Sequence, residues 1–399
     1  MTDTGQTDLP AIFLHPGRDK RLAAGHPWAY ANEVKMSPEA KAIPPGSLVR
    51  LHRVDGKPLG IGTFNAHALI CFRRFDESRM VDVELVRERL VIAAAWRDRL
   101  FDQPFYRLIH GEADGLPGLV IDRFDDVFVL QSGTRGMDGL TPLVVEALVD
   151  AFSPRAIVAR NDGQGRRTEQ LDSRVEILAG SIDGPLGLSE NAIRATADPL
   201  GGQKTGWFFD QRDNRAFAAR LVPDGGTFLD AYCYGGGFGL AALGAGAAKA
   251  CFIDSSKPAL DLVQASVAAN GFTERATTRS GDAFDALESL SAEGTSFDVV
   301  SCDPPAFAKS KKDVPAALKG YRKVARLGAK LVKRGGALIL SSCSHHVDLD
   351  SFQRECAIGL RRAGRKGQLL RTGGAAPDHP VLADLPESAY LKCLAFRLD

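Results

Sequence analysis

From about residue 225 onward, short and mostly apolar strand candidates alternate with helical stretches, and this alternation restricts the fold more than any other feature. The strand candidates are TFLDAY, ACFID, ATTRSGD, FDVVSCD and GALILSS. One separating helix, KPALDLVQASVAAN, follows Ser256, carries Pro258 in its first turn and closes at Asn270-Gly271. Such alternation predicts a doubly wound parallel sheet, in which ligands bind at the carboxyl ends of the strands.

A glycine-rich loop, LDAYCYGGGFG at residues 229–239, joins the first of these strands to the next helix. Glycines at such a point let the backbone approach a bound nucleotide closely. Acids stand at the ends of three successive strands, namely Asp230, Asp254 and Asp282. We expect Asp254 to bond ribose hydroxyls and Asp282 to bond an adenine amino group. The alternative interpretation is a turn of glycines with helix-capping aspartates.

The loop also indicates which nucleotide is bound. It does not match GxGxxG, no arginine or lysine follows it to hold phosphate, and the chain has no GxxxxGK[ST] motif. A ligand with a ribose and an adenine but no pyrophosphate fits better, and S-adenosylmethionine is such a ligand. A dinucleotide-dependent oxidoreductase would share the acids but would need GxGxxG and a hydride-relay residue.

The fourth strand ends in CDPPAF, residues 302–307. The two prolines fix an extended backbone and direct the Asp303 carboxylate into the predicted cleft. Amino-group methyltransferases need an aromatic side chain directly after the prolines, but this chain has Ala306. Methylation at carbon 5 of a pyrimidine instead needs a nucleophile that adds to carbon 6. Cys343 ends the next strand between two serines, so we predict it as that nucleophile, with a thiolate formed near neutral pH.

Bulk composition is that of a soluble protein of two or three domains. The chain has 399 residues, 44% of them apolar, with no run of 18 apolar residues and no signal-peptide pattern, so we expect a cytoplasmic location and no membrane partner. Seven cysteines without a CxxC pair argue against disulfides and zinc. His345 and His346 lack a third ligand at usable spacing, so no metal site is predicted.

Residues 1–76 contain short alternating apolar runs, broken at Asp55-Gly56, that predict hairpins of a small β-barrel. Residues 77–200 are predicted to form a central α/β domain, and residues 201–399 the nucleotide-binding domain. The central domain begins with an amphipathic helix over about 80–100, whose apolar face is predicted to carry Val83, Val86, Leu90, Ala93, Trp96 and Leu100.

The net charge of +1 gives no general signal for nucleic acid, so such a partner must be bound by local patches. Between Lys309 and Arg334 there are ten basic residues and one acid. These are interpreted as a solvated helix face or, because they follow Asp303, as phosphate contacts. We predict that five residues contact the RNA, namely Lys309, Lys311, Lys312, Arg73 and Arg74.

Eight stretches resemble one known family, the PUA-containing RNA cytosine-5 methyltransferases that act on bacterial large-subunit ribosomal RNA. They are HPWAYANEV (26–34), GEADGLPGLVIDRF (111–124), GQKTGWFFDQRDNR (202–215), LDAYCYGGGF (229–238), DPPAFAKSK (303–311), GY (320–321), SSCS (341–344) and DHPVLADLPESAYLKC (378–393). The resemblance implies a PUA-like RNA-binding domain, a central domain and a class I Rossmann-like methyltransferase domain. Two departures are Gly235, where the family usually has threonine, and Asn65-Ala66-His67, where it has Asn-Pro.

The resemblance also implies the site residues and the partners. It assigns Cys343 as nucleophile, Asp303 beside the target base, S-adenosylmethionine as cofactor and ribosomal RNA as substrate. The implied cofactor contacts are Asp230, Tyr232, Gly235, Gly236, Gly237, Asp254, Ser255, Asp282, Ala283 and Asp303, with Lys204, Thr205, Asp210, Arg212 and Asn214 in the domain-junction motif.

Several alternatives stay open at this point. The base that removes the carbon-5 proton is Asp378, His379 or Glu387. The target is cytosine or uracil, and the chain is a monomer or a homodimer. A non-catalytic RNA-binding module would keep the N-terminal barrel but would not need Cys343 beside Asp303.

Overall fold

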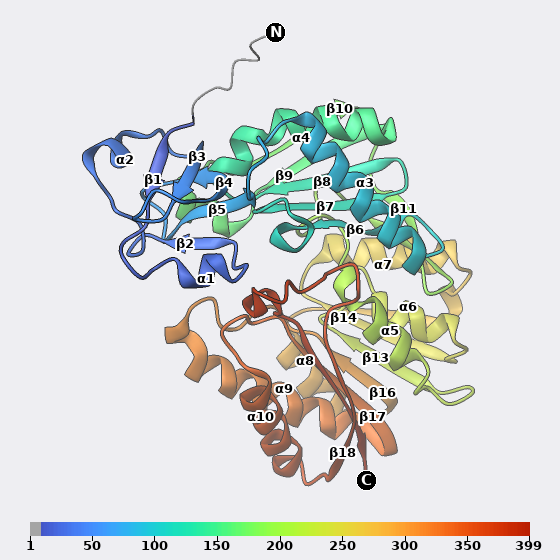
Figure 1. The fold of residues 1–399 in the computed structure, drawn as a ribbon. Coiled ribbons are helices and arrows are strands. Elements are labelled where there is room, and N and C mark those ends of the chain that lie inside the picture. Colours follow the sequence, from blue (N-terminus) through green and yellow to red (C-terminus); the bar gives the residue numbers. More distant parts are fainter. Residues whose placement is uncertain (1–8) are drawn as a thin grey trace. The chain divides into compact units, whose positions relative to one another are not determined.

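The computed structural model describes residues 9–399, so residues 1–8 of the predicted N-terminal domain lie outside the described part (Figure 1). The chain forms two compact units. Unit 1 comprises the chain up to Gly184 together with Pro380–Ser388, and unit 2 comprises Pro185–His379 and Ala389–Asp399. Across residues 9–399, no helix combines the length and apolar character needed to cross a bilayer.

The first sheet of unit 1 is small and curled, as predicted for the N-terminal region. Its elements are β1 (Ala11–Phe13), α1 (Lys20–Ala23), β2 (Trp28–Tyr30), α2 (Pro38–Ala42), β3 (Ser47–His52), β4 (Pro58–Phe64) and β5 (Ile70–Asp76). The strand order is β1-β3-β4-β5-β2. β3 and β4 pair antiparallel around Asp55-Gly56, as the turn residues predict. Alternate strand residues such as Val49, Leu51 and Phe72 form a separate core.

The second sheet of unit 1 has the order β10-β9-β8-β7-β6. Its elements are α3 (Val83–Leu100), β6 (Phe105–His110), β7 (Leu119–Phe124), β8 (Val127–Ser132), α4 (Arg135–Phe152), β9 (Ala156–Asn161) and β10 (Arg174–Gly180). Helix α3 confirms the predicted helix but not its whole apolar face, since Trp96 is 57% exposed. Arg97 is buried instead, because its guanidinium donates to both carboxylate oxygens of Asp114.

Unit 2 contains the predicted doubly wound sheet, preceded by the hairpin β11 (Leu186–Glu190) and β12 (Ile193–Ala197). The strands are β13 (Thr227–Ala231), β14 (Lys249–Asp254), β15 (Ala276–Ser280), β16 (Phe297–Cys302), β17 (Val332–Ser342), β18 (Gly367–Gly373) and β19 (Lys392–Leu398). Their order is β15-β14-β13-β16-β17-β19-β18. The five predicted strands are parallel, but β18 and β19 pair antiparallel, so the sheet is mixed. No crossover helix joins these two strands, and parallel pairing would need such a connection.

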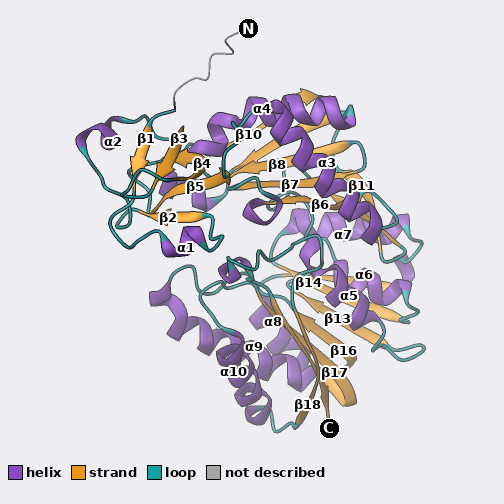
Figure 2. Cartoon of the chain, viewed as in Figure 1, coloured by secondary structure: helices purple, strands orange, loops and turns teal. Residues whose placement is uncertain are grey.

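Helices cover both faces of this sheet (Figure 2). α5 (Arg212–Ala219), α6 (Gly237–Gly244) and α7 (Lys257–Ala269) lie on one face, and α8 (Ala283–Ala292), α9 (Val314–Leu331) and α10 (Leu349–Arg362) lie on the other. The chain leaves β13 toward β14 in one direction and leaves β16 toward β17 in the other, so the strand order reverses between β13 and β16. Such a switch point is where open α/β sheets bind ligands.

Candidate active site

A cavity of about 540 Å³ lies at the carboxyl ends of the parallel strands in unit 2. Its wall contains residues that follow each of β13 to β17, together with a segment that precedes α5 and a segment that precedes β19. The predicted site residues that line it are Lys204, Asp210, Tyr232, Gly235, Gly237, Asp254, Ser255, Asp282, Ala283, Asp303 and Cys343. The fold therefore brings together residues spread over 140 positions of the chain, from 204 to 343.

The other five predicted contacts lie behind this wall, where they support it. Asp230 is buried, and its Oδ2 accepts the backbone N–H of Gly239 at 2.9 Å. Burial raises the pKa of Asp230 to about 8. Gly236 takes a left-handed conformation (φ +80°) at the start of α6. The remaining three, Thr205, Arg212 and Asn214, are buried polar residues.

The glycine loop has no room for a side chain at two of its positions, because neighbouring side chains already fill that space. A Cβ at Gly235 would lie 2.9 Å from Cζ3 of Trp207, and one at Gly237 would lie 2.3 Å from Nε of Arg215. A threonine at 235 would therefore displace the Trp207 ring. Trp207 and Arg215 line the cavity, and the Arg215 guanidinium stacks 4.5 Å from the Trp207 ring centroid. Sequence analysis missed both residues, although both belong to the domain-junction motif.

The strand-end acids cap local backbone and also line the cavity. The Asp254 oxygens accept N–H groups of Ser256 and Tyr234, both at 2.9 Å. Oδ1 of Asp282 accepts the N–H of Phe284 at 2.8 Å and so caps α8. The helix-capping interpretation is thus correct for Asp282, whereas Asp254 bonds loop backbone and Ser256 caps α7. A carboxylate oxygen has more than one lone pair, so the same groups can also accept ribose or adenine donors.

Asp303 is held by a short chain of side-chain hydrogen bonds. Asn214 donates to Oε1 of Gln211 at 2.7 Å, and Gln211 donates through Nε2 to Oδ2 of Asp303 at 2.9 Å. Loss of solvent and the nearby Asp210 carboxylate raise the pKa of Asp303 to about 7, although Gln211 and Lys204 act in the opposite direction. Asp303 is therefore a group that can gain or lose a proton near neutral pH.

Cys343 is half-buried in the cavity wall, on a loop that is fixed from several sides. Ser342 donates to the Tyr321 hydroxyl at 2.9 Å, and this hydroxyl lies 2.7 Å from Oγ of Ser344. Lys392 donates to the Ser344 carbonyl at 2.7 Å. Burial, assisted by the Asp303 carboxylate, raises the pKa of the Cys343 thiol to about 11. The expectation of a thiolate near neutral pH is therefore wrong for the free protein.

None of the three sequence-derived base candidates lines this cavity. Asp378 and His379 are buried and bond to each other, with 2.8 Å between Oδ1 and Nδ1. Glu387 belongs to unit 1. The carboxylate that lines the cavity beside Asp303 is instead Asp210, which accepts a hydrogen bond from Tyr390. Tyr390 reaches it from 180 residues away in the chain, which sequence analysis could not anticipate.

The predicted phosphate contacts of unit 1 have internal partners. Arg73 forms an ion pair of 2.6 Å with Glu112 and stacks 5.0 Å from the Trp28 ring centroid. Arg74 donates to the carbonyl of Gly25 at 2.8 Å and to two further carbonyls. Both guanidinium groups stabilise the fold of unit 1, so we do not retain them as phosphate contacts. The three predicted lysines of unit 2 are exposed between β16 and α9.

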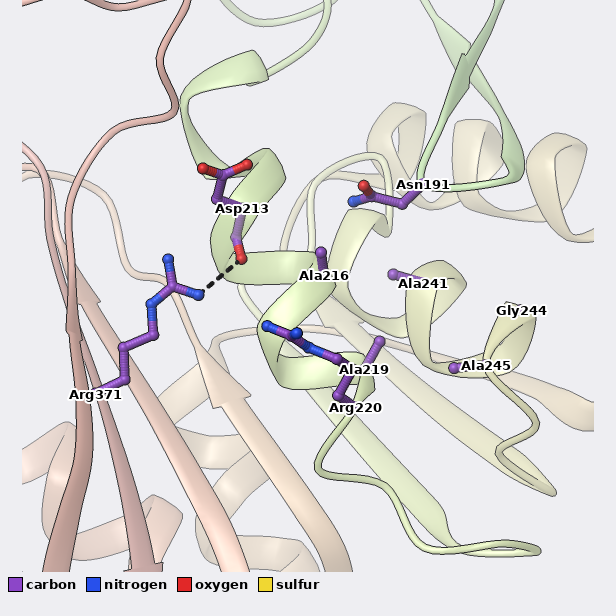
Figure 3. A pocket seen from close by; sticks show the side chains of 9 residues that line it. All are labelled: Asn191, Asp213, Ala216, Ala219, Arg220, Ala241, Gly244, Ala245 and Arg371. Carbon is purple, nitrogen blue, oxygen red and sulfur yellow. Dashed lines mark hydrogen bonds between the residues drawn. The ribbon is translucent and has the colours of Figure 1, made fainter. Parts of the chain in front are cut away.

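Unit 2 has a second hollow of about 510 Å³ (Figure 3). Alanines of α5 and α6, among them Ala216 and Ala241, form part of its wall, and Arg371 donates to the Asp213 carbonyl at 3.2 Å. Arg215 of α5 lines the first cavity, whereas other residues of α5 line this hollow. None of the predicted site residues, all of which are described, lines this hollow, so the first cavity is the candidate active site.

The fold and the cavity define the class of protein as a Rossmann-like, S-adenosylmethionine-dependent methyltransferase with an N-terminal PUA-like domain. A model of the PUA-like domain matches residues 12–77, and a model described as conserved hypothetical protein 95 matches residues 214–334. The chain belongs to the ribosomal RNA large subunit methyltransferase I family. It is 37% identical over 395 residues to the family's protein from Shewanella amazonensis, covering 97% of this chain and 99% of that one.

Solved structures show the same fold over nearly the whole chain. One, described as a SAM-dependent methyltransferase from Streptococcus mutans, has a TM-score of 0.81 at 19% identity and covers 98% of this chain and 100% of its own. Another, described as a methyltransferase complexed with SAH, has a TM-score of 0.82 with the same identity and coverage. At this identity the likeness is one of fold.

Proposed function

We propose that the chain transfers a methyl group from S-adenosylmethionine to carbon 5 of a cytosine in large-subunit ribosomal RNA. The observation that carries the proposal is that Cys343 and Asp303 line one cavity with Asp254 and Asp282. A nucleophile, a base-holding carboxyl group and two nucleoside-binding acids thus meet at one switch point. Membership in a family named for large-subunit ribosomal RNA supports the substrate, and the PUA-like domain supports RNA binding.

In the proposed reaction the Cys343 thiol first releases its proton to solvent, and Sγ of the resulting thiolate forms a bond to carbon 6. Electrons move through the ring toward N3, which Asp303 protonates, and carbon 5 becomes nucleophilic. Carbon 5 then takes the methyl group, and S-adenosylhomocysteine leaves. A carboxylate removes the carbon-5 proton while the bond from carbon 6 to sulfur breaks. N3 returns its proton to Asp303, and the released thiolate takes up a proton from solvent. We assign removal of the carbon-5 proton to Asp210, because it lines the cavity beside Asp303.

The protonation state of Asp303 favours cytosine over uracil. Cytosine presents an acceptor at N3 and a donor at its amino group, and a neutral carboxylic acid offers the matching donor and acceptor. Uracil presents N3–H instead, which suits an ionised, acceptor-only carboxylate. A pKa of about 7 keeps a large share of Asp303 neutral at physiological pH. Uracil-5 methylation is the second candidate, and it would be favoured by an ionised Asp303.

The experiment uses unmethylated large-subunit ribosomal RNA and RNA carrying 5-fluorocytosine. Cys343→Ala should abolish methyl transfer while S-adenosylmethionine affinity stays within about threefold, or ~0.7 kcal/mol. Fluorine cannot leave as a proton does, so wild-type protein should accumulate a covalent adduct that the variant does not form. Cys356→Ala is the matched control, because that thiol is fully buried away from the cavity. Full activity in Cys343→Ala would overturn the nucleophile assignment.

A further inference from the structure

The polar face of α9 lines a hollow of about 420 Å³ whose described wall consists of cationic side chains. Four come from α9 and one from α10: Lys319, Arg322, Lys323, Arg326 and Arg362. We propose that this hollow holds a phosphodiester group of the RNA strand whose target base enters the active site. The inference rests on the proposed function. It narrows the phosphate contacts expected along the basic run Lys309–Arg334 to one hollow and adds Arg362 of α10.

The charges in the hollow are only partly balanced. Glu288 of α8 lies 3.5 Å from Lys323 and 3.9 Å from Arg326, and Glu355 pairs with Arg322 at 2.5 Å. Two carboxylates thus face five cations, and Lys319 and Arg362 form no ion pair within residues 9–399. An excess of three positive charges around one concavity repels itself in the free protein. A bound phosphate relieves that repulsion and releases counterions.

The packing of the two helices creates this geometry. Gly359 of α10 lies against α9, since a Cβ there would lie 2.6 Å from Cβ of Ala325 and 2.7 Å from the Arg322 carbonyl oxygen. Any larger residue would push the helices apart. Arg362 follows Gly359 by three residues, about one helical turn, so the close approach brings its guanidinium to the cations of α9.

The hollow adjoins the active-site cavity. Nζ of Lys323 lies 4.4 Å from the ring centroid of Phe284, and Phe284 is part of the cavity wall. The buried side of the same helix carries Tyr321, which braces the serines on either side of Cys343. A phosphate in the hollow would therefore be separated from the cavity by one aromatic ring. Contacts of this kind position a strand without reading its sequence, so the expected ligand is the sugar–phosphate backbone.

The test measures RNA binding by the full-length protein as a function of salt. The probe is unmethylated large-subunit ribosomal RNA transcribed in vitro. The double variant Lys319→Ala/Arg362→Ala removes the two cations that lack an acidic partner. The control Lys330→Ala/Arg361→Ala removes the same charge from exposed positions of the same two helices outside the hollow. We expect the slope of log K against log salt to fall by roughly 1.4 in the first variant, about 0.7 per lost contact with a single strand.

The salt slopes of the two variants either support or overturn the phosphate site. A reduced slope in the hollow variant alone, with unchanged S-adenosylmethionine affinity, supports the phosphate site. Equal slopes in the wild type and the hollow variant, or equal losses in the hollow variant and the control, overturn it and leave a solvated helix face. Failure of the proposed function would be seen in a different measurement. If that function is wrong, wild-type protein transfers no methyl group to the RNA, whatever the salt slopes are.

Discussion

The pH dependence of methyl transfer tests the roles of Cys343 and Asp303 together. The proposed reaction needs Cys343 as a thiolate and Asp303 as a neutral acid, but pKa values of about 11 and about 7 favour the opposite arrangement. Between these two values the thiolate fraction rises tenfold per pH unit while the neutral fraction of Asp303 falls tenfold. The reactive population is therefore constant at roughly 1 in 10⁴, a cost of about 5 kcal/mol.

The expected profile of kcat/KM rises tenfold per pH unit up to about pH 7 and is then level to pH 9, measured with tritiated S-adenosylmethionine and limiting RNA. Asp303→Asn removes the group that titrates near pH 7, so its lower rate should keep rising from pH 7 to 9 with the thiol. Gln211→Ala removes a hydrogen bond that lowers the pKa of Asp303, so the break should move to higher pH. A wild-type rate that rises tenfold per unit throughout pH 7–9 would refute the need for neutral Asp303.

Two further predictions concern the ligands. Asp254→Ala should weaken S-adenosylmethionine by about 1–3 kcal/mol in calorimetry with little effect on RNA affinity, and an unchanged affinity would mean that Asp254 only caps backbone. Replacing Lys309, Lys311 and Lys312 with alanine should lower the salt slope of RNA binding by about 2 while S-adenosylmethionine affinity stays the same; an unchanged slope would exclude these lysines as phosphate contacts.

Sequence reasoning succeeded where local pattern decides the outcome. The glycine loop and the strand-end acids Asp254 and Asp282 follow from strand–helix alternation, because parallel strands place their carboxyl ends at one edge. It failed where distant segments meet. Trp207 enters the cavity because Gly235 leaves room for its ring, and neither residue alone indicates that contact. The antiparallel strands β18 and β19 were missed for a similar reason, since no helix between them marks a repeating unit.

The C-terminal segment contacts the proposed catalytic groups through hydrogen bonds that the sequence did not predict. Tyr390 donates a hydrogen bond to Oδ2 of Asp210 and so fixes the position of that carboxylate. Burial and the Asp210 carboxylate together raise the pKa of Asp303 to about 7. Lys392, two residues further on, fixes the backbone next to Cys343. The segment that enters β19 thus stabilises both the proposed proton donor and the proposed nucleophile. The start of β19 therefore supports the candidate active site, whereas no residue of β18 lines the cavity.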